Sequence, residues 1–385
     1  MNTENADHQL LRESVRRFVD RHMPRESARM WDKKNIFPRD VYDALAEMGV
    51  MGLTVPEAYG GQGVDIAGTM IVIEELARRS SAVACPYIMT ACYAGMNLVE
   101  SGSEEQKREL LPRVAAGKLL FAYGLSEPNV GGDLAMVETV ARTEGNRILL
   151  SGTKRWCTGA HLADYVFCLA RTGPKEDRYR NLTIFLVPPK SRGVTITPLD
   201  HLGIRGVETT DAHFDDVELG EDAILGGPAM WNQGWRQLAG RALEVEKLEL
   251  SAVALGLAEA ACADAISYAE TRVQFGKPIG AHQAIRHAIA EAKTTTLAMR
   301  LMLYNAAALV QDRKPSALES SMTKLFCCEG ASEVTLKCQR IMGAYGLSDL
   351  MDMERYVRDA ISLPIVGGSS NMQKNNIANR LKIAE

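Results

Sequence analysis

Glu246 is a carboxylate within an otherwise apolar segment, which makes it the first candidate for chemistry. Ala242 and Leu250 lie four residues to either side of it, and helical spacing places the three on one face. A carboxylate on an apolar face is unfavourable unless it is paired or functional, and burial would raise its pKa into the range of a general base. The alternative is an ordinary helix-surface glutamate, the commonest environment for this residue type.

Two neighbouring glutamates differ from Glu246 in their spacing. Glu244 lies three residues from both Arg241 and Lys247, a pattern that favours a solvated face with ion pairs. Glu249 lies between the two faces of the same helix and is a weaker candidate for a base.

A second group of candidates lies in residues 123–133 and 152–158. Gly131 and Gly132 allow backbone to approach a bulky ligand, and Ser126 offers a hydroxyl to a polar ring edge. Trp156 can form a flat apolar wall, with Thr158 as a further donor. Taken alone, Trp156 is better explained as a core aromatic residue on a strand, and only the neighbouring loop 123–133 favours the ligand wall.

Arg272 is a third candidate, because a guanidinium binds phosphate oxygens with two parallel hydrogen bonds. It could also be a solvated surface arginine.

Helical patterns position these residues at both ends of the chain. Pro38 and Gly49 bracket a helix at 41–48, and Ser103 with Gln106 forms a capping box ahead of a helix at 104–115. From about residue 230 the 3.6-residue period returns in long helices, which predicts an antiparallel bundle. Its first apolar stripe comprises Trp235, Leu238, Ala242, Val245, Leu248, Ala252 and Leu255.

The middle of the chain has a different sequence pattern, in which short runs of β-branched and aromatic residues are separated by turn residues. No helical pattern intervenes, which disfavours a Rossmann fold and predicts an antiparallel β unit. We therefore predict an α+β protein with an N-terminal helical domain (1–116), an antiparallel β-domain (117–228) and a C-terminal four-helix-bundle domain (229–385). The expected strands are 119–125, 137–142, 148–150, 165–170, 182–187 and 194–197.

Composition excludes several classes of function. The 385 residues include 44 Lys+Arg and 48 Asp+Glu, a net charge of −4, which argues against nucleic-acid or polybasic membrane binding. None of the eight cysteines forms a C-x-x-C pair, so we expect reduced thiols and no metal site. The sequence has no apolar leader and no uninterrupted apolar run of about 18 residues, so we expect a cytoplasmic protein without a membrane span.

Four segments in order along the chain resemble the acyl-CoA dehydrogenase family. They are residues 45–61, residues 123–133 with 152–158, residues 272–283, and residues 339–346 followed by Arg358-Asp359 and the glycine turn 364–373.

The resemblance implies FAD as cofactor, an acyl-CoA substrate, an electron-transferring flavoprotein as partner and a homo-oligomer, usually a tetramer. Residues expected to contact FAD are Tyr123, Leu125, Ser126, Gly131, Gly132, Trp156, Thr158, Gln283, Ser369 and Asn371, together with Arg272, Gln274, Phe275, Gln339 and Gly343 reaching a neighbouring subunit. Residues expected to contact the acyl-CoA are Gly132, Leu243, Lys247, Gly367 and Gly368, with Tyr87, Met89, Cys92 and Met96 around the acyl group.

The implied reaction oxidises the Cα–Cβ bond of the thioester and needs a carboxylate beside the α-proton. Most members of the family carry this glutamate at the position that Gly367 fills here. A branch that includes isovaleryl-CoA, long-chain and crotonobetainyl-CoA enzymes carries it on the first bundle helix instead. Residues 243–248 resemble that pattern and place Glu246 as the base, with Lys247 where the branch usually has arginine.

Other activities on the same scaffold are an enoyl-CoA reductase, an acyl-CoA oxidase and a non-catalytic acyl-CoA- or flavin-binding protein.

Overall fold

The computed structural model describes residues 5–382 and begins with a cluster of helices. Two expected ends are confirmed: Gly49 adopts φ +78° just past α3, and Ser103 and Gln106 form the capping box of α7 at 3.1 and 3.2 Å. The helices are α1 (Ala6–His22), α2 (Arg25–Lys34), α3 (Arg39–Glu47), α4 (Ile66–Ala77), α5 (Ser81–Tyr87), a π-helix (Ile88–Ala94), α6 (Gly95–Ser101) and α7 (Glu104–Ala115).

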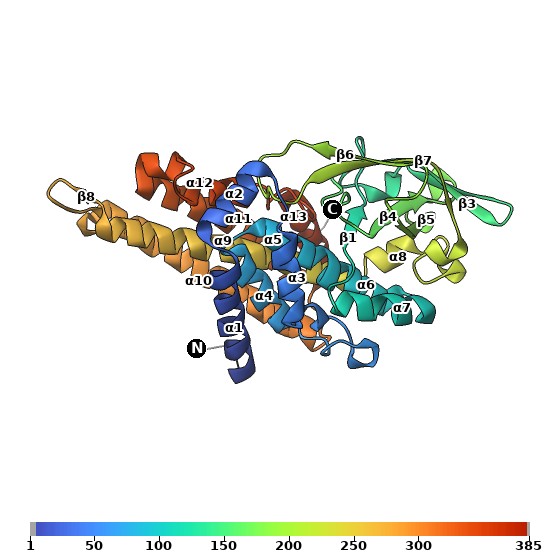
Figure 1. The fold of residues 1–385 in the computed structure, drawn as a ribbon, viewed down its shortest axis with the longest axis horizontal. Helices are drawn as coiled ribbons and strands as arrows, with labels where there is room; N and C mark the ends of the chain where they lie inside the picture. Colours follow the sequence, from blue (N-terminus) through green and yellow to red (C-terminus); the bar gives the residue numbers. More distant parts are fainter. Residues whose placement is uncertain (1–4, 383–385) are drawn as a thin grey trace.

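The β-domain forms one twisted sheet beside the helices (Figure 1). Strand order is β1-β4-β2-β3-β7-β6, with β5 paired to β4. The sheet is mainly antiparallel, as expected, but β1 and β2 pair with β4 in parallel. The strands are β1 (Phe121–Gly124), β2 (Val140–Glu144), β3 (Arg147–Lys154), β4 (Tyr165–Arg171), β5 (Leu182–Val187), β6 (Val194–Leu199) and β7 (Thr209–Leu219).

β7, the longest strand of the sheet, has no counterpart among the strands expected from the sequence. Thr210, Ala212 and Phe214 are buried in alternation, but the buried positions then shift to Val217 and Leu219. A bulge causes the shift, since the pairing with β3 changes register at this point. A break in the period of two hides a strand from pattern analysis.

The C-terminal domain consists mainly of helices, and two of them, α9 and α10, pack against α4 (Figure 1). Three of these helices are long, and the expected apolar stripe is interrupted because Trp235 and Leu238 lie on a separate short helix. The elements are α8 (Gly234–Leu238), α9 (Arg241–Thr271), the hairpin β8 (Val273–Gln274) and β9 (Lys277–Pro278), α10 (Gln283–Gln311), α11 (Ala317–Met342), α12 (Met353–Ala360) and α13 (Ser370–Arg380).

Two helical stretches, Ser81–Ser101 and Arg241–Thr271, are long and apolar enough to cross a membrane by length and composition alone. Most of their residues are buried inside the protein, as expected for core helices of this fold. All eight cysteines are free thiols, and every one except Cys85 is buried.

Candidate active site

Glu246 and Gly367 face each other across the interface between α9 and the glycine turn. A Cβ added to Gly367 would lie 3.4 Å from Glu246 Oε1 and only 2.1 Å from Leu250 Cδ1. Gly367 also adopts φ +59°, a conformation that favours glycine. A side chain at 367 would therefore overlap Leu250 and come into contact with the Glu246 carboxyl group.

Burial changes the acidity of Glu246. The side chain is half-buried on the first turns of α9. Desolvation raises its pKa to about 7, while Lys247, the nearby Tyr93 hydroxyl and Lys324 act in the opposite direction. The Tyr93 hydroxyl is close, but it forms no well-aligned hydrogen bond within the described chain. A carboxyl with this pKa can hold or release a proton near neutral pH, as a general base must.

The neighbours of Glu246 on α9 differ partly from expectation. Lys247 donates a hydrogen bond to Glu244 at 3.0 Å, so the expected ion pair is present. It is not solvated, because Lys247 is buried and Glu244 is half-buried. Leu243 is half-buried on the preceding turn.

A cluster of polar side chains beside Glu246 was not predicted. Glu249 is completely buried, and so is Asn97, while Tyr93 and Tyr123 are nearly so. The two tyrosine rings stack with centroids 3.9 Å apart. Tyr123 therefore lies within the core next to Tyr93, and its ring faces this cluster. The signal in the sequence was the presence of a tyrosine and an asparagine inside the apolar run 81–98.

The loop after β1 is held by a buried ion pair. Lys154 donates to Glu127 at 2.7 Å and to the Leu125 carbonyl at 3.1 Å, and both charged side chains are almost completely buried. The Arg155 N–H bonds to the Ser126 carbonyl at 2.9 Å. These bonds fix Leu125 and Ser126 next to the segment that carries Trp156.

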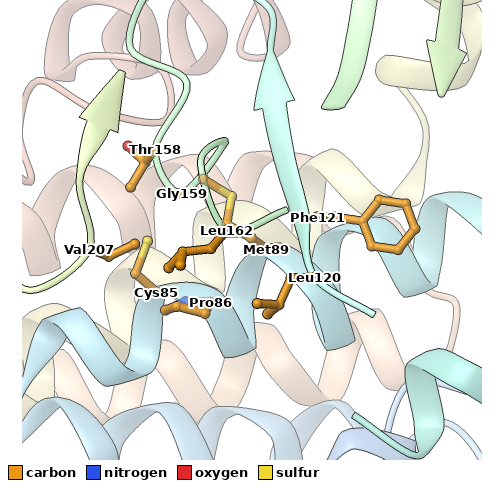
Figure 2. Close-up of a pocket in the computed structure, with 9 residues that line it drawn as sticks. All are labelled: Cys85, Pro86, Met89, Leu120, Phe121, Thr158, Gly159, Leu162 and Val207. Atoms are coloured by element: carbon orange, nitrogen blue, oxygen red, sulfur yellow. The ribbon is translucent and has the colours of Figure 1, made fainter. Parts of the chain in front are cut away.

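Trp156 is not a core residue. Its side chain is 57% exposed, its backbone adopts φ +67°, and the Arg155 guanidinium lies 5.9 Å from the centre of its ring. Thr158 lines a shallow pocket between α5 and the loop after β3 (Figure 2). Its hydroxyl lies 3.1 Å from that of Thr209. Other residues of this pocket are Cys85, Pro86, Met89, Leu120, Phe121, Gly159, Leu162 and Val207.

The structure brings the loop after β1 next to the glycine turn. A Cβ on Gly132 would lie 3.4 Å from Met372 Sδ on α13, and one on Gly131 would enter open space among the described residues. Ser369 caps α13 by accepting a bond from the Met372 N–H at 3.4 Å, while Asn371 is exposed in the first turn. Gly368 adopts φ +77°, and its carbonyl accepts a bond from Gln373 at 2.9 Å.

The remaining predicted cofactor residues lie at the other end of the bundle. Phe275 occupies the tip of the β8–β9 hairpin and is 94% exposed. Figure 1 shows this hairpin at the end of the molecule opposite the sheet. Tyr268 and Tyr345, with ring centres 6.0 Å apart, place the segment after α11 at the same end. Arg272, Gln274, Gln283, Gln339 and Gly343 are therefore remote from Trp156 within one chain.

These features fit a flat aromatic cofactor. The exposed Trp156 indole, the Ser126 and Thr158 hydroxyls and the paired glycines Gly131 and Gly132 are suited to contact a planar ring system.

The chain matches the acyl-CoA dehydrogenase family in three consecutive parts: the N-terminal domain over residues 5–118, the middle domain over 122–217 and the C-terminal domain over 232–382. It is 32% identical over 383 residues to the probable acyl-CoA dehydrogenase YngJ of Bacillus subtilis, covering 99% of this chain and 100% of that protein. It is 33% identical to the CarC subunit of the caffeyl-CoA reductase–Etf complex of Acetobacterium woodii, covering 98% of both.

Among solved structures, glutaryl-CoA dehydrogenase in complex with glutaryl-CoA superposes with a TM-score of 0.94 at 32% identity, over 100% of this chain and 97% of that one. The match extends over all three domains in the same order. The chain therefore belongs to the acyl-CoA dehydrogenase family and is an oxidoreductase of that family.

Proposed function

We propose that this protein catalyses the α,β-dehydrogenation of an acyl-CoA thioester, with Glu246 as the base that removes the α-proton. The observation that carries the proposal is the placement of Glu246 Oε1 against Gly367. The position used by most of the family has no side chain here, and a carboxylate from α9 occupies the adjoining space. This arrangement favours the branch of the family whose base lies on the first bundle helix.

FAD is the cofactor we propose, and when bound it accepts the hydride from the β-carbon. Ser126, Trp156 and Thr158 would hold its ring system, since they share one surface beside the glycine loop. The diphosphate would be bound by Arg272 and its hairpin from a neighbouring subunit, because that hairpin is remote from Trp156 in its own chain.

The environment of Glu246 in the folded chain gives this residue the acidity that proton transfer requires. Glu246 holds its proton below pH 7 and releases it above, because burial has raised its pKa to about 7. Gly132, Leu243, Lys247, Gly367 and Gly368 would contact the thioester and the adjoining part of CoA, around the opening between the loop after β1 and the glycine turn.

Flavin bleaching under anaerobic conditions tests this proposal. We expect wild-type protein loaded with FAD to bleach when mixed with an acyl-CoA from a panel of chain lengths, and Glu246→Gln to bleach at least about 100-fold more slowly. Glu109→Gln, an exposed carboxylate on α7, is the control and should match the wild type. Equal bleaching by Glu246→Gln would remove Glu246 from the mechanism, and no bleaching by the wild type would favour a binding protein.

The reverse reaction is the second candidate, because a relative is named as a subunit of a caffeyl-CoA reductase–Etf complex. We propose an electron-transferring flavoprotein as partner for either direction. Rates of electron transfer from acyl-CoA to such a flavoprotein, and from the reduced flavoprotein to enoyl-CoA, decide between the directions. Rapid peroxide formation in air without a partner would instead indicate an oxidase.

We propose a cytoplasmic homotetramer. The exposed Phe275 at the hairpin tip and the separation of that hairpin from Trp156 support assembly, because a neighbouring chain would have to complete the cofactor site. Mass photometry of the FAD-loaded protein measures the assembly state, and a monomer with bound FAD would overturn this proposal.

A further inference from the structure

The buried carboxyl of Glu249 takes no part in the proposed proton transfer. It lies on α9 one turn beyond Glu246, and the residue is completely buried. Neither of its oxygens has a hydrogen-bond partner among residues 5–382. Burying a carboxyl group without partners is unfavourable, so its presence indicates that something else satisfies it in the working protein.

Three more polar atoms around Glu249 are also buried without a hydrogen-bond partner among the described residues. The hydroxyls of Tyr93 and Tyr123 and Oδ1 of Asn97 are buried and, within the part of the chain described, unbonded. These residues are 4%, 6% and 0% exposed. The Tyr93 and Tyr123 rings stack with centroids 3.9 Å apart, and the π-helix that carries Tyr93 packs against α9, which carries both glutamates. Burial, together with the Glu246 and Glu249 carboxyls, raises the pKa of both tyrosines. The polar atoms therefore form one cluster that continues inward from the base.

The backbone opposite α9 fixes this cluster in place. Tyr93 lies on the π-helix Ile88–Ala94, which packs against α9. The Thr54 hydroxyl donates to the Ala91 carbonyl, and the Thr90 hydroxyl accepts a bond from the Phe121 N–H at 3.1 Å. π-helical turns are rare and occur frequently at functional sites. Here the turn carries Tyr93 on the segment that packs against α9, the helix of Glu246 and Glu249.

Resting on the function proposed above, we propose that Glu249, Tyr93 and Tyr123 bind a neutral hydroxyl group, alcoholic or phenolic, on the acyl tail of the substrate. A hydroxyl both donates and accepts hydrogen bonds, so it can satisfy an acid and two phenols together. A carboxylate tail would meet two acids in a buried site, which is unfavourable. A cationic tail would pair well only with an ionised Glu249. Ionising Glu249 beside the Glu246 carboxyl group is unfavourable, because like charges in a buried site repel each other.

The ligand chemistry follows from the protonation of Glu249. Burial and the neighbouring Glu246 raise the pKa of Glu249 well above its usual value, which favours the neutral acid in the free protein. A neutral acid donates one hydrogen bond and accepts others.

For an acyl tail that runs along α9 from Glu246 towards Glu249, the spacing of the two glutamates gives the position of the hydroxyl. Residues three apart on a helix are separated by about 4.5 Å along its axis. In an extended acyl chain roughly three or four carbon–carbon bonds of about 1.5 Å cover that distance. With Cα at Glu246, the hydroxyl would lie five or six carbons from the thioester. The matched probes are 6-hydroxyhexanoyl-CoA and heptanoyl-CoA, in which a methyl group replaces the hydroxyl.

Flavin bleaching with these two probes tests the proposal on the FAD-loaded enzyme. We expect kcat/KM for the hydroxyl compound to exceed that for the methyl compound about 10-fold in the wild type. Glu249→Leu should remove the preference by lowering kcat/KM for the hydroxyl compound alone. Glu249→Gln retains a donor and an acceptor and should keep most of the preference, so it controls for a folding defect in the leucine variant.

Equal kcat/KM for the two probes in the wild type, or a preference that survives in Glu249→Leu, would overturn the hydroxyl site while leaving the proposed dehydrogenation intact. A stronger preference for 6-aminohexanoyl-CoA or adipyl-CoA would also overturn it. If wild type oxidises no acyl-CoA at all, the proposed function fails. Calorimetric dissociation constants for the two probes then decide the hydroxyl site separately: a ratio near one rejects it, and tighter binding of the hydroxyl compound supports it.

Discussion

Replacing Glu246 with glutamine should stabilise the protein at high pH. The pKa of Glu246 rises from an ordinary 4.5 to about 7 in the folded chain. The folded state therefore binds this proton more tightly than the unfolded state, and stability falls as pH rises from 4.5 to 7. Each pKa unit corresponds to about 1.4 kcal/mol, which gives a penalty of about 3 kcal/mol above pH 7. Because the side chain is only half-buried, we expect about 2 kcal/mol in practice.

Urea denaturation of wild type and Glu246→Gln at pH 8 and pH 5 measures this effect. The variant should be about 2 kcal/mol more stable at pH 8, and the difference should shrink below about 1 kcal/mol at pH 5. Glu109→Gln on α7 should change stability little at either pH, because that carboxylate is exposed. A gain of equal size at both pH values, or no gain at pH 8, would refute the claim that burial of an ionised Glu246 opposes folding.

Three further predictions concern the elements around the base. Lys154→Met should lower the free energy of unfolding by about 3–5 kcal/mol, because it leaves Glu127 buried without its cation; a loss below about 1 kcal/mol in urea denaturation would contradict this. Gly367→Ala should cost about 1–3 kcal/mol of stability and slow flavin bleaching, because the added methyl overlaps Leu250 at a positive φ; a variant unchanged in both assays would show that the turn tolerates a side chain. Phe275→Ala should leave unfolding unchanged but lower FAD content and the assembly mass; full FAD content at wild-type mass would rule out a role in a neighbouring site.

The order of the domains could be predicted from hydrophobic periodicity and from Gly, Pro and capping residues, because each of these signals depends only on residues close in the sequence. The ends of α3 and α7 follow from Gly49 and from the Ser103–Gln106 box, whose geometry depends only on nearby residues. The β7 strand escaped detection because a bulge shifts its buried face by one residue. The parallel pairing of β1 with β4 involves segments more than 40 residues apart and has no local signal.

The part of the candidate site that could be predicted from the sequence is the part where a polar residue stands among apolar ones. Glu246 was recognised because a carboxylate interrupts an apolar face, and the structure puts its oxygen against Gly367. The burial of Glu249 was not foreseen, because a helix with one apolar stripe is expected to expose its other face to water. In the structure α4, α10 and α11 all pack against α9, so more than one face of α9 is buried. Tyr93 was missed because it lies on a π-helix, which does not follow the period of 3.6. Asn97 lies on α6, directly after this π-helix, so its position relative to the preceding helix was missed as well.

Exchange of the α-proton in D2O tests the central claim most directly, because it isolates proton removal from electron transfer. Wild-type protein should incorporate deuterium at Cα of an acyl-CoA, with a rate that rises with pH around an apparent pKa near 7, since Glu246 must be ionised to act as base. Glu246→Gln should show no exchange above background, while Glu249→Gln should retain it. Exchange at the wild-type rate in Glu246→Gln, or its loss in Glu249→Gln alone, would contradict the assignment of Glu246 as the base.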